Sequence, residues 1–195
     1  MFTVIGYYTK NTLYESHARR FMESLKQFKI PSFVMPIDSL GTWRRNTNYK
    51  PTFIKDCLKK IIGRNLVYVD CDAEFLQYPN LFDELGEDID CDIAVHLFDK
   101  SQHGSQCKGF EILSGTIFLK NNKTVYDLIE RWELECKRRP TVWDQKSLQE
   151  VLGENYTYLP ACYCTIFDVM KHVKNPVIIH HQASREVRKR NGKLD

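Results

Sequence analysis

The sequence predicts an α/β fold in which helices flank a central, mostly parallel sheet. Short β-branched or aromatic runs alternate with amphipathic helical patterns along the chain, which is typical of a sheet layered by helices. The chain has 195 residues, enough for one domain with its own core, and no internal repeat, low-complexity tract or linker divides it. We therefore treat residues 1–195 as a single domain with a basic tail from about residue 183.

The first half of the chain alternates strands and helices. Apolar or β-branched runs that end in polar loops predict strands at residues 2–8, 33–37 and 66–69. Apolar residues at helical spacing predict helices at residues 12–28 and 51–62, the second opened by Pro51 and followed by Gly63. The polar stretch from Asp38 to Tyr49 is expected to be a long loop that covers a site.

The second half continues this alternation. A short helical piece at residues 80–85 precedes strands at residues 93–98 and 112–119, which a polar loop at residues 99–109 separates. Helices are expected at residues 125–138 and 144–152, because Pro140 stops the first and Gly153 follows the second. Short strands near residues 156–159 and at residues 177–179 complete the pattern.

Composition excludes several classes of function. The formal net charge of +3 is too close to neutral to indicate a nucleic-acid partner. No apolar run reaches the roughly 18 residues of a spanning helix, and the apolar start lacks the basic leader of a signal peptide. The seven scattered cysteines include no Cys-x-x-Cys pair, so we expect free, mostly buried thiols. These features predict a cytoplasmic protein without a transmembrane segment.

The most informative segment is the acidic pair that follows a buried strand, in the sequence Leu66 to Asp72. Open α/β sheets bind ligands at the carboxyl ends of their strands, which is where Asp70 and Asp72 stand. A carboxylate at that position costs several kcal/mol of desolvation unless it is paired or bound to a metal. Carboxylate oxygens suit Mg²⁺ or Mn²⁺, which in turn bind phosphates. The two other Asp-x-Asp patterns, in residues 88–92, lie in a polar turn and are interpreted as turn residues.

With this motif, the chain resembles the GT-A glycosyltransferases, which transfer a sugar from a nucleotide diphosphate sugar and bind Mn²⁺ or Mg²⁺ at an Asp-x-Asp. It is most similar to the retaining members of the glycogenin and lipopolysaccharide galactosyltransferase type. The similarity covers nearly the whole chain as an ordered series of short motifs. It implies a GT-A, Rossmann-like fold, a UDP- or GDP-sugar donor, and a glycan, protein or lipid-linked acceptor.

The resemblance assigns several residues to the donor nucleotide. Tyr7 and Thr9 stand where such enzymes bind the base and ribose, although a core aromatic is an equally good interpretation of Tyr7. Lys50 matches a cation near the donor phosphates, with a solvated helix start as the alternative. The family's diphosphate-binding Lys is missing after the last strand, and Arg185 or Arg188 is expected to replace it.

Two further motifs are assigned to the sugar and the reaction. Ser114 and Gly115 match a turn on which the donor sugar lies close to the backbone, although Gly115 could equally mark a bulge. Asp144 and Gln145 resemble the family's Asp-Gln pair, near which the acceptor hydroxyl would approach. The alternative for Asp144 is a plain N-cap. Three tryptophans could stack on a sugar: Trp43, Trp132 and Trp143. Trp132 is expected in the middle of a helix, which makes it a candidate for the core instead.

The paired histidines after the last apolar strand match the histidine that completes the family's metal site. Neighbouring side chains in a strand face opposite ways, so only one of the two should reach the metal, and we favour His180 over His181. The resemblance therefore implies a metal site of Asp70, Asp72 and His180, with retention of configuration at the transferred sugar.

Two alternatives from other classes remain open. A phosphatase of the haloacid-dehalogenase type also uses an Asp-x-Asp, but it needs a Thr or Val where Glu74 stands and carries the motif on its first strand. A non-catalytic module that binds nucleotide sugars or nucleic acid would use the basic residues of the tail. Such a tail is more often a solvated terminus. Its basic residues are Arg185, Arg188, Lys189, Arg190 and Lys193.

Overall fold

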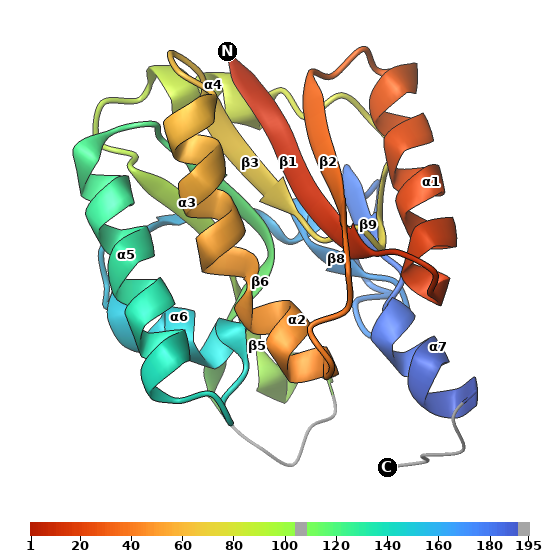
Figure 1. Cartoon of the computed structure of the whole chain (residues 1–195). Coiled ribbons are helices and arrows are strands. Elements are labelled where there is room, and N and C mark those ends of the chain that lie inside the picture. Colours follow the sequence, from red (N-terminus) through yellow and green to blue (C-terminus); the bar gives the residue numbers. More distant parts are fainter. Residues whose placement is uncertain (104–108, 191–195) are drawn as a thin grey trace.

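A six-stranded sheet with the order β2-β1-β3-β6-β5-β7 forms the centre of the computed structural model, which describes residues 1–103 and 109–190 (Figure 1). Every strand pair is parallel except the two that involve β6, so the predicted mostly parallel sheet is confirmed. The described residues leave out 104–108, which contain Cys107 and belong to the predicted loop at 99–109, and 191–195, which contain Lys193. The strands are β1 (Phe2–Thr9), β2 (Ser32–Ile37), β3 (Asn65–Val69), β5 (Ile93–Asp99), β6 (Phe110–Leu119) and β7 (Thr157–Tyr158).

Helices cover both faces of this sheet (Figure 1). On one face α3, α5 and α6 pack against alternate strand residues such as Leu66 and Tyr68, and on the other α1 and α4 pack against Val67 and Val69. This alternation places a buried core on each side of β3. No helix in the described ranges is long and apolar enough to cross a membrane. The helices are α1 (Leu13–Gln27), α2 (Trp43–Asn48), α3 (Lys50–Lys60), α4 (Leu81–Glu87), α5 (Lys123–Arg138), α6 (Asp144–Leu152) and α7 (Ala183–Arg190), with short 3₁₀ turns η1 (Lys100–His103) and η2 (Ala161–Tyr163).

Two segments differ from the sequence-based expectation. The predicted loop at 38–49 contains α2, which Thr42 caps by accepting a hydrogen bond from the Arg45 N–H at 3.2 Å. This helix has no buried residue, so it carries no apolar pattern that would reveal it. The basic tail begins as the helix α7, and side chains are described as far as Glu186.

A second, smaller sheet with the order β4-β9-β8 lies beyond the end of β3. Its strands are β4 (Ala73–Phe75), β8 (Thr165–Ile166) and β9 (Ile178–His180), and β4 and β8 are too short to have been predicted. Ala73 pairs with His180 across the antiparallel β4 and β9 strands. This pairing brings β9, which ends at His180, beside Asp70 and Asp72, although the two segments are more than a hundred residues apart in sequence.

A bulge in β6 shapes the centre of the sheet. Val95 of β5 pairs with Ile117, but the next residue, His96, pairs with Leu113, so β6 carries three extra residues between these two pairs. The extra residues, 114–116, are drawn toward β3, where the Gly115 carbonyl accepts a hydrogen bond from the Asp70 N–H at 2.8 Å. The bulge interpretation of Gly115 is therefore confirmed, and the bulge itself lies beside the acidic pair.

Candidate functional site

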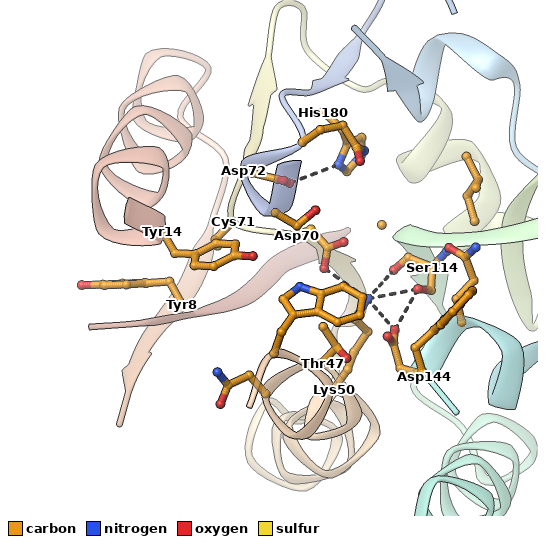
Figure 2. Close-up of a pocket in the computed structure, with 18 of the residues that line it drawn as sticks. Tyr8, Tyr14, Thr47, Lys50, Asp70, Cys71, Asp72, Ser114, Asp144 and His180 are labelled. Atoms are coloured by element: carbon orange, nitrogen blue, oxygen red, sulfur yellow. Dashed lines mark hydrogen bonds and ion pairs between the residues drawn. The ribbon is translucent and has the colours of Figure 1, made fainter. Parts of the chain in front are cut away.

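A pocket of about 480 Å³ opens at the ends of β1 and β3 and beside the bulge of β6, and α2, α6, β9 and the start of α7 complete its walls (Figure 2). Its position at the carboxyl ends of β1 and β3 is the one expected for a ligand site in an open α/β sheet. The structure brings every residue predicted for the site to this pocket. These are Tyr7, Thr9, Lys50, Asp70, Asp72, Ser114, Gly115, Asp144, Gln145, His180 and Arg185.

Three of these side chains could hold a metal ion. Asp70, Asp72 and His180 each offer a ligand atom, and these atoms all lie within 4.8 Å of one another. In Figure 2, Asp72 and His180 face each other, and Asp72 Oδ1 is 3.8 Å from His180 Nδ1. The second ring nitrogen of His180 lies 2.9 Å from the Thr116 hydroxyl, which fixes the orientation of the ring. Two carboxylates and one imidazole fit the ligand preferences of Mn²⁺ or Mg²⁺.

The electrostatics of this cluster favour added positive charge. Burial raises the pKa of Asp70, although nearby Lys50 acts against that rise. Burial also opposes ionisation of Asp72, but the hydrogen bond and charge of His180 outweigh it and lower the pKa of Asp72. Burial would lower the pKa of His180, yet Cys164 and Asp72 raise it to about 10. Without a metal, a proton on His180 therefore supplies charge that a divalent cation could supply instead.

The two adjacent histidines have different surroundings. His180 is buried and faces the acidic pair, whereas His181 Nε2 lies 2.9 Å from a carboxylate oxygen of Glu74. The His181 ring also lies beside Phe167, with ring centroids 6.0 Å apart. Alternation along β9 thus separates the two side chains, and His180 is the one that joins the acidic pair.

Asp72 also connects the cluster to the C-terminal helix. Its Oδ2 atom accepts a hydrogen bond from the Ala183 N–H, at the start of α7, at 2.8 Å. The two oxygens of Asp72 therefore have separate partners, one toward His180 and one at the helix N-terminus. This contact had no sequence signal, because it joins residues 111 positions apart.

Lys50 is buried, which excludes the solvated helix start considered from the sequence. Its ammonium lies 3.1 Å from Asp70 Oδ1 and 2.8 Å from Asp144 Oδ2 (Figure 2). It also donates to the Ser114 carbonyl at 3.0 Å and approaches the Ser114 hydroxyl at 3.1 Å. Burial alone would lower the pKa of Lys50, but the two carboxylates raise it above its ordinary value. Lys50 thus joins the acidic pair to the Asp-Gln pair.

Asp144 is the first residue of α6 and not its N-cap, because Trp143 occupies the cap position and no side chain caps the helix. The Asp144 carboxylate instead accepts a hydrogen bond from the Ser114 hydroxyl at 2.9 Å, beside Lys50. Gln145 accepts a hydrogen bond from the Ser114 N–H at 3.1 Å and donates to Glu111 at 2.8 Å. Both members of the Asp-Gln pair are therefore fixed to the bulged part of β6.

The three tryptophans separate into core and pocket residues. Trp132 is fully buried, and its indole N–H donates to the Asp144 carbonyl at 2.8 Å. It supports the start of α6 from behind and cannot stack on a ligand. Trp43 of α2 and Trp143 before α6 both line the pocket. The Lys146 ammonium lies 4.6 Å from the centroid of the Trp143 ring.

Gly115 has a steric role beside Asp70 and His180. A Cβ at this position would lie 3.0 Å from His180 Cε1 and 3.3 Å from both His180 Nδ1 and Asp70 Oδ2. Ordinary carbon contacts are about 3.5–4.0 Å, so any side chain would press on the cluster. The absence of a side chain at this bulge therefore leaves room for the side chains of Asp70 and His180.

The residues assigned to the nucleotide differ in their surroundings. Tyr7 is mostly buried against Tyr49 and Phe53, and its hydroxyl donates to the Asn46 carbonyl at 2.6 Å, as expected for a core aromatic that anchors α2. Thr9 lies at the pocket edge of the same strand.

Arg185 lines the pocket from the first turn of α7. Its guanidinium forms an ion pair with Asp168 and remains partly exposed. Sequence reasoning gave no role to Thr116, which orients His180 and ends the motif that contains Ser114 and Gly115. It missed Glu111, which orients Gln145, because Glu111 belongs to no motif.

The comparisons with known proteins agree with this fold. Residues 42–194 match the model of a family described as nucleotide-diphospho-sugar transferase. The match covers more than half of the chain, and the chain belongs to this family. This membership gives no support to the haloacid-dehalogenase alternative. A comparison with curated protein sequences gave no match.

Solved structures of glycosyltransferases share the fold. A glycosyltransferase involved in glycosylation of the major capsid of PBCV-1 aligns with a TM-score of 0.73 and 14% identity, over 98% of each chain. Galactosyltransferase LgtC, solved with donor and acceptor sugar analogues, aligns with a TM-score of 0.60 and 11% identity, over 98% of this chain and 100% of its own. Apo GlyE of Streptococcus pneumoniae TIGR4 aligns with a TM-score of 0.64 and 14% identity, over 99% of this chain and 60% of its own. The expected GT-A fold is confirmed.

Proposed function

We propose that this protein is a metal-dependent glycosyltransferase that moves a sugar from a UDP- or GDP-sugar to a hydroxyl of a glycan, protein or lipid-linked acceptor, with retention of configuration. One observation carries the proposal. A cluster of metal-ligand type, Asp70, Asp72 and His180, shares a pocket with the network of Lys50 and Asp144, on the fold of a nucleotide-diphospho-sugar transferase.

Asp70, Asp72 and His180 would hold Mn²⁺ or Mg²⁺, which when bound acts as a Lewis acid toward the charge that develops on the departing nucleoside diphosphate. Arg185, in the first turn of α7, would add positive charge on the same side of the pocket. The start of α7 contributes its helix dipole in the same sense. These features together support binding of a diphosphate here.

The opposite wall of the pocket would position the sugar and the acceptor. Lys50 and the Ser114 hydroxyl hold the Asp144 carboxylate in one orientation. A fixed negative charge at this place would stabilise positive charge that develops at the anomeric carbon. Gln145, held by Glu111 and the Ser114 N–H, would orient the acceptor hydroxyl. At the part of the pocket that would hold the base and ribose, Tyr7 would position α2 through its hydrogen bond to Asn46. Thr9 would border the nucleotide.

We also propose a cytoplasmic location. Six cysteines in the described residues are free, and most of them are buried. Free thiols in this number fit a reducing compartment.

The experiment is a calorimetric titration of UDP and of GDP, each with and without Mn²⁺, into wild type, Asp72→Asn and Asp90→Asn. Asp90 belongs to another Asp-x-Asp and is exposed in a turn, so its variant is a matched control. We expect Mn²⁺-dependent binding of one nucleotide that Asp72→Asn loses and Asp90→Asn keeps. Folded wild type that binds neither nucleotide with Mn²⁺ present would refute the proposal.

Turnover distinguishes the enzyme from a binding module. Many transferases release the nucleotide slowly from the donor when water replaces the acceptor, so UDP or GDP release from a panel of nucleotide sugars can be followed before the acceptor is known. Tight nucleotide binding without any release or transfer would favour the non-catalytic module instead.

A further inference from the structure

A second hollow lies on the edge of the central sheet, outside the donor pocket. Its volume is about 470 Å³, similar to that of the donor pocket. The pairing of β5 with β7 ends at Val95, so the edge of β5 from His96 onward borders this hollow instead of a neighbouring strand. The hollow is lined by His96, Leu97, Asp99, Phe110, Tyr158, Ala161, Met170 and His172.

Two aromatic side chains at the hollow are unusually exposed. Phe110 is 60% exposed and Tyr158 is 62% exposed, although large aromatic side chains gain most from burial. They come from different strands, β6 and β7, and line the same hollow. Exposed aromatic faces next to polar groups are typical of surfaces that bind a partly apolar, partly polar ligand.

The polar lining identifies the class of ligand. Imidazoles from His96 and His172 and the Asp99 carboxylate line the hollow, and groups of these types exchange hydrogen bonds with hydroxyl groups. Within the protein, His96 Nδ1 lies 2.9 Å from the Leu159 carbonyl oxygen, and Asp99 Oδ1 accepts hydrogen bonds from the Ser101 N–H and hydroxyl at 2.9 and 2.7 Å. None of the described residues that line the hollow is a lysine or an arginine, and the one carboxylate disfavours an anion. Aromatic faces combined with such hydrogen-bonding groups and a carboxylate fit a neutral sugar better than a phosphorylated one.

The hollow adjoins the donor pocket through two shared segments. Leu113 lines the donor pocket, and its pairing partner His96 lines the hollow. In the last third of the chain, Ile166 lines the donor pocket while Met170 lines the hollow, and the Ile166 N–H lies 3.3 Å from the Met170 sulfur. The two cavities therefore lie on neighbouring residues of the same segments.

We propose that this hollow is a subsite for the acceptor, and that it binds a sugar residue of a neutral oligosaccharide at a distance from the reacting hydroxyl. That the bound glycan is an acceptor rests on the proposed transferase function. That the hollow binds a neutral glycan is inferred from its lining residues alone. It assigns specificity for the acceptor to Phe110 and Tyr158 on the sheet edge and not only to residues of the donor pocket.

The test uses a printed glycan array probed with the full-length protein in the presence of UDP and Mn²⁺. The variants are Phe110→Ala/Tyr158→Ala and, as a matched control, Tyr78→Ala, an exposed tyrosine that does not line the hollow. We expect wild type and the control to bind a related set of neutral glycans, and the double variant to lose at least tenfold in signal. Calorimetric titration of UDP with Mn²⁺ should be equal in all three proteins.

Two results would overturn the subsite. One is that wild type takes up UDP but binds no neutral glycan, and the other is that the double variant binds glycans as wild type does. If neither UDP nor GDP binds with Mn²⁺ present, the donor site fails, and the array still decides whether the hollow binds sugars. Failure of the proposed function and failure of the subsite are thus separate outcomes.

Discussion

Gly115→Ala tests whether the bulge in β6 is shaped for a metal site. The new Cβ would lie 3.0 Å from His180 Cε1 and 3.3 Å from Asp70 Oδ2. To restore an ordinary contact, the His180 ring must move by about 0.5 Å, because carbon contacts are about 3.5–4.0 Å. The ring has little room to move, since it is buried and bonded to Thr116.

A metal site tolerates ligand displacements of only about 0.2 Å. We therefore expect Gly115→Ala to weaken Mn²⁺ binding by about 10–100-fold, or about 1.4–2.8 kcal/mol. Overpacking should also cost about 1–3 kcal/mol of stability. The assays are calorimetric titration with Mn²⁺ and denaturant unfolding.

The control is Ile117→Val, a fully buried residue two positions further along β6. It should cost about 0.5–1.5 kcal/mol of stability through lost packing and leave the affinity for Mn²⁺ unchanged. If Gly115→Ala binds Mn²⁺ with wild-type affinity, the steric account of this glycine is wrong.

Three further predictions concern the supports of the site and the fold. Lys50→Met should destabilise the protein by about 3–5 kcal/mol in denaturant unfolding, because it leaves buried carboxylates without a compensating charge. Adding Asp144→Asn should recover part of this loss. Equal stability of the single and double variants would contradict the pairing of Lys50 with Asp144. Trp132→Phe removes the N–H donor to the Asp144 carbonyl, so kcat for donor turnover should fall about tenfold while the affinity for UDP is kept, and a loss of UDP affinity alone would contradict this role. Burial would raise the pKa of Glu133, but hydrogen bonds from Lys55 and its neighbours lower it to about 2, so Glu133→Gln should cost about 1–2 kcal/mol at pH 7. Because the lowered pKa stabilises the fold only above the unfolded value near 4.5, this difference should shrink as the pH falls from about 4.5 to 2 in thermal unfolding, and a constant difference would be evidence against it.

The sequence predicted the strands and helices that have a clear apolar pattern, and it failed where burial follows from tertiary contacts. The strand before Asp70 and the helix from Asp144 to Leu152 were predicted at nearly their observed bounds. The helix α2 was missed because it buries no residue, and β4 because it has only three residues. Patterns of period 3.6 or 2 need several buried residues before they become visible.

Part of the lining of the candidate site could be predicted from the sequence, but its arrangement could not. An acidic pair at the end of a buried strand is a local signal, and the resemblance supplied its partners. The burial of Lys50 between Asp70 and Asp144 depends on contacts among α3, β3 and α6 that no local pattern encodes. The roles of Thr116 and of the Ala183 N–H were invisible for the same reason.

The central claim is that Asp70, Asp72 and His180 form a metal site, and electron paramagnetic resonance of Mn²⁺ tests it most directly. Free Mn²⁺ gives a strong signal that decreases on binding, so wild type, His180→Gln and His181→Gln can be titrated under identical conditions. The account predicts that wild type and His181→Gln decrease the free Mn²⁺ signal with similar affinity, and that His180→Gln binds Mn²⁺ at least tenfold more weakly. The claim is contradicted if wild type leaves the signal unchanged, or if His181→Gln and not His180→Gln abolishes binding.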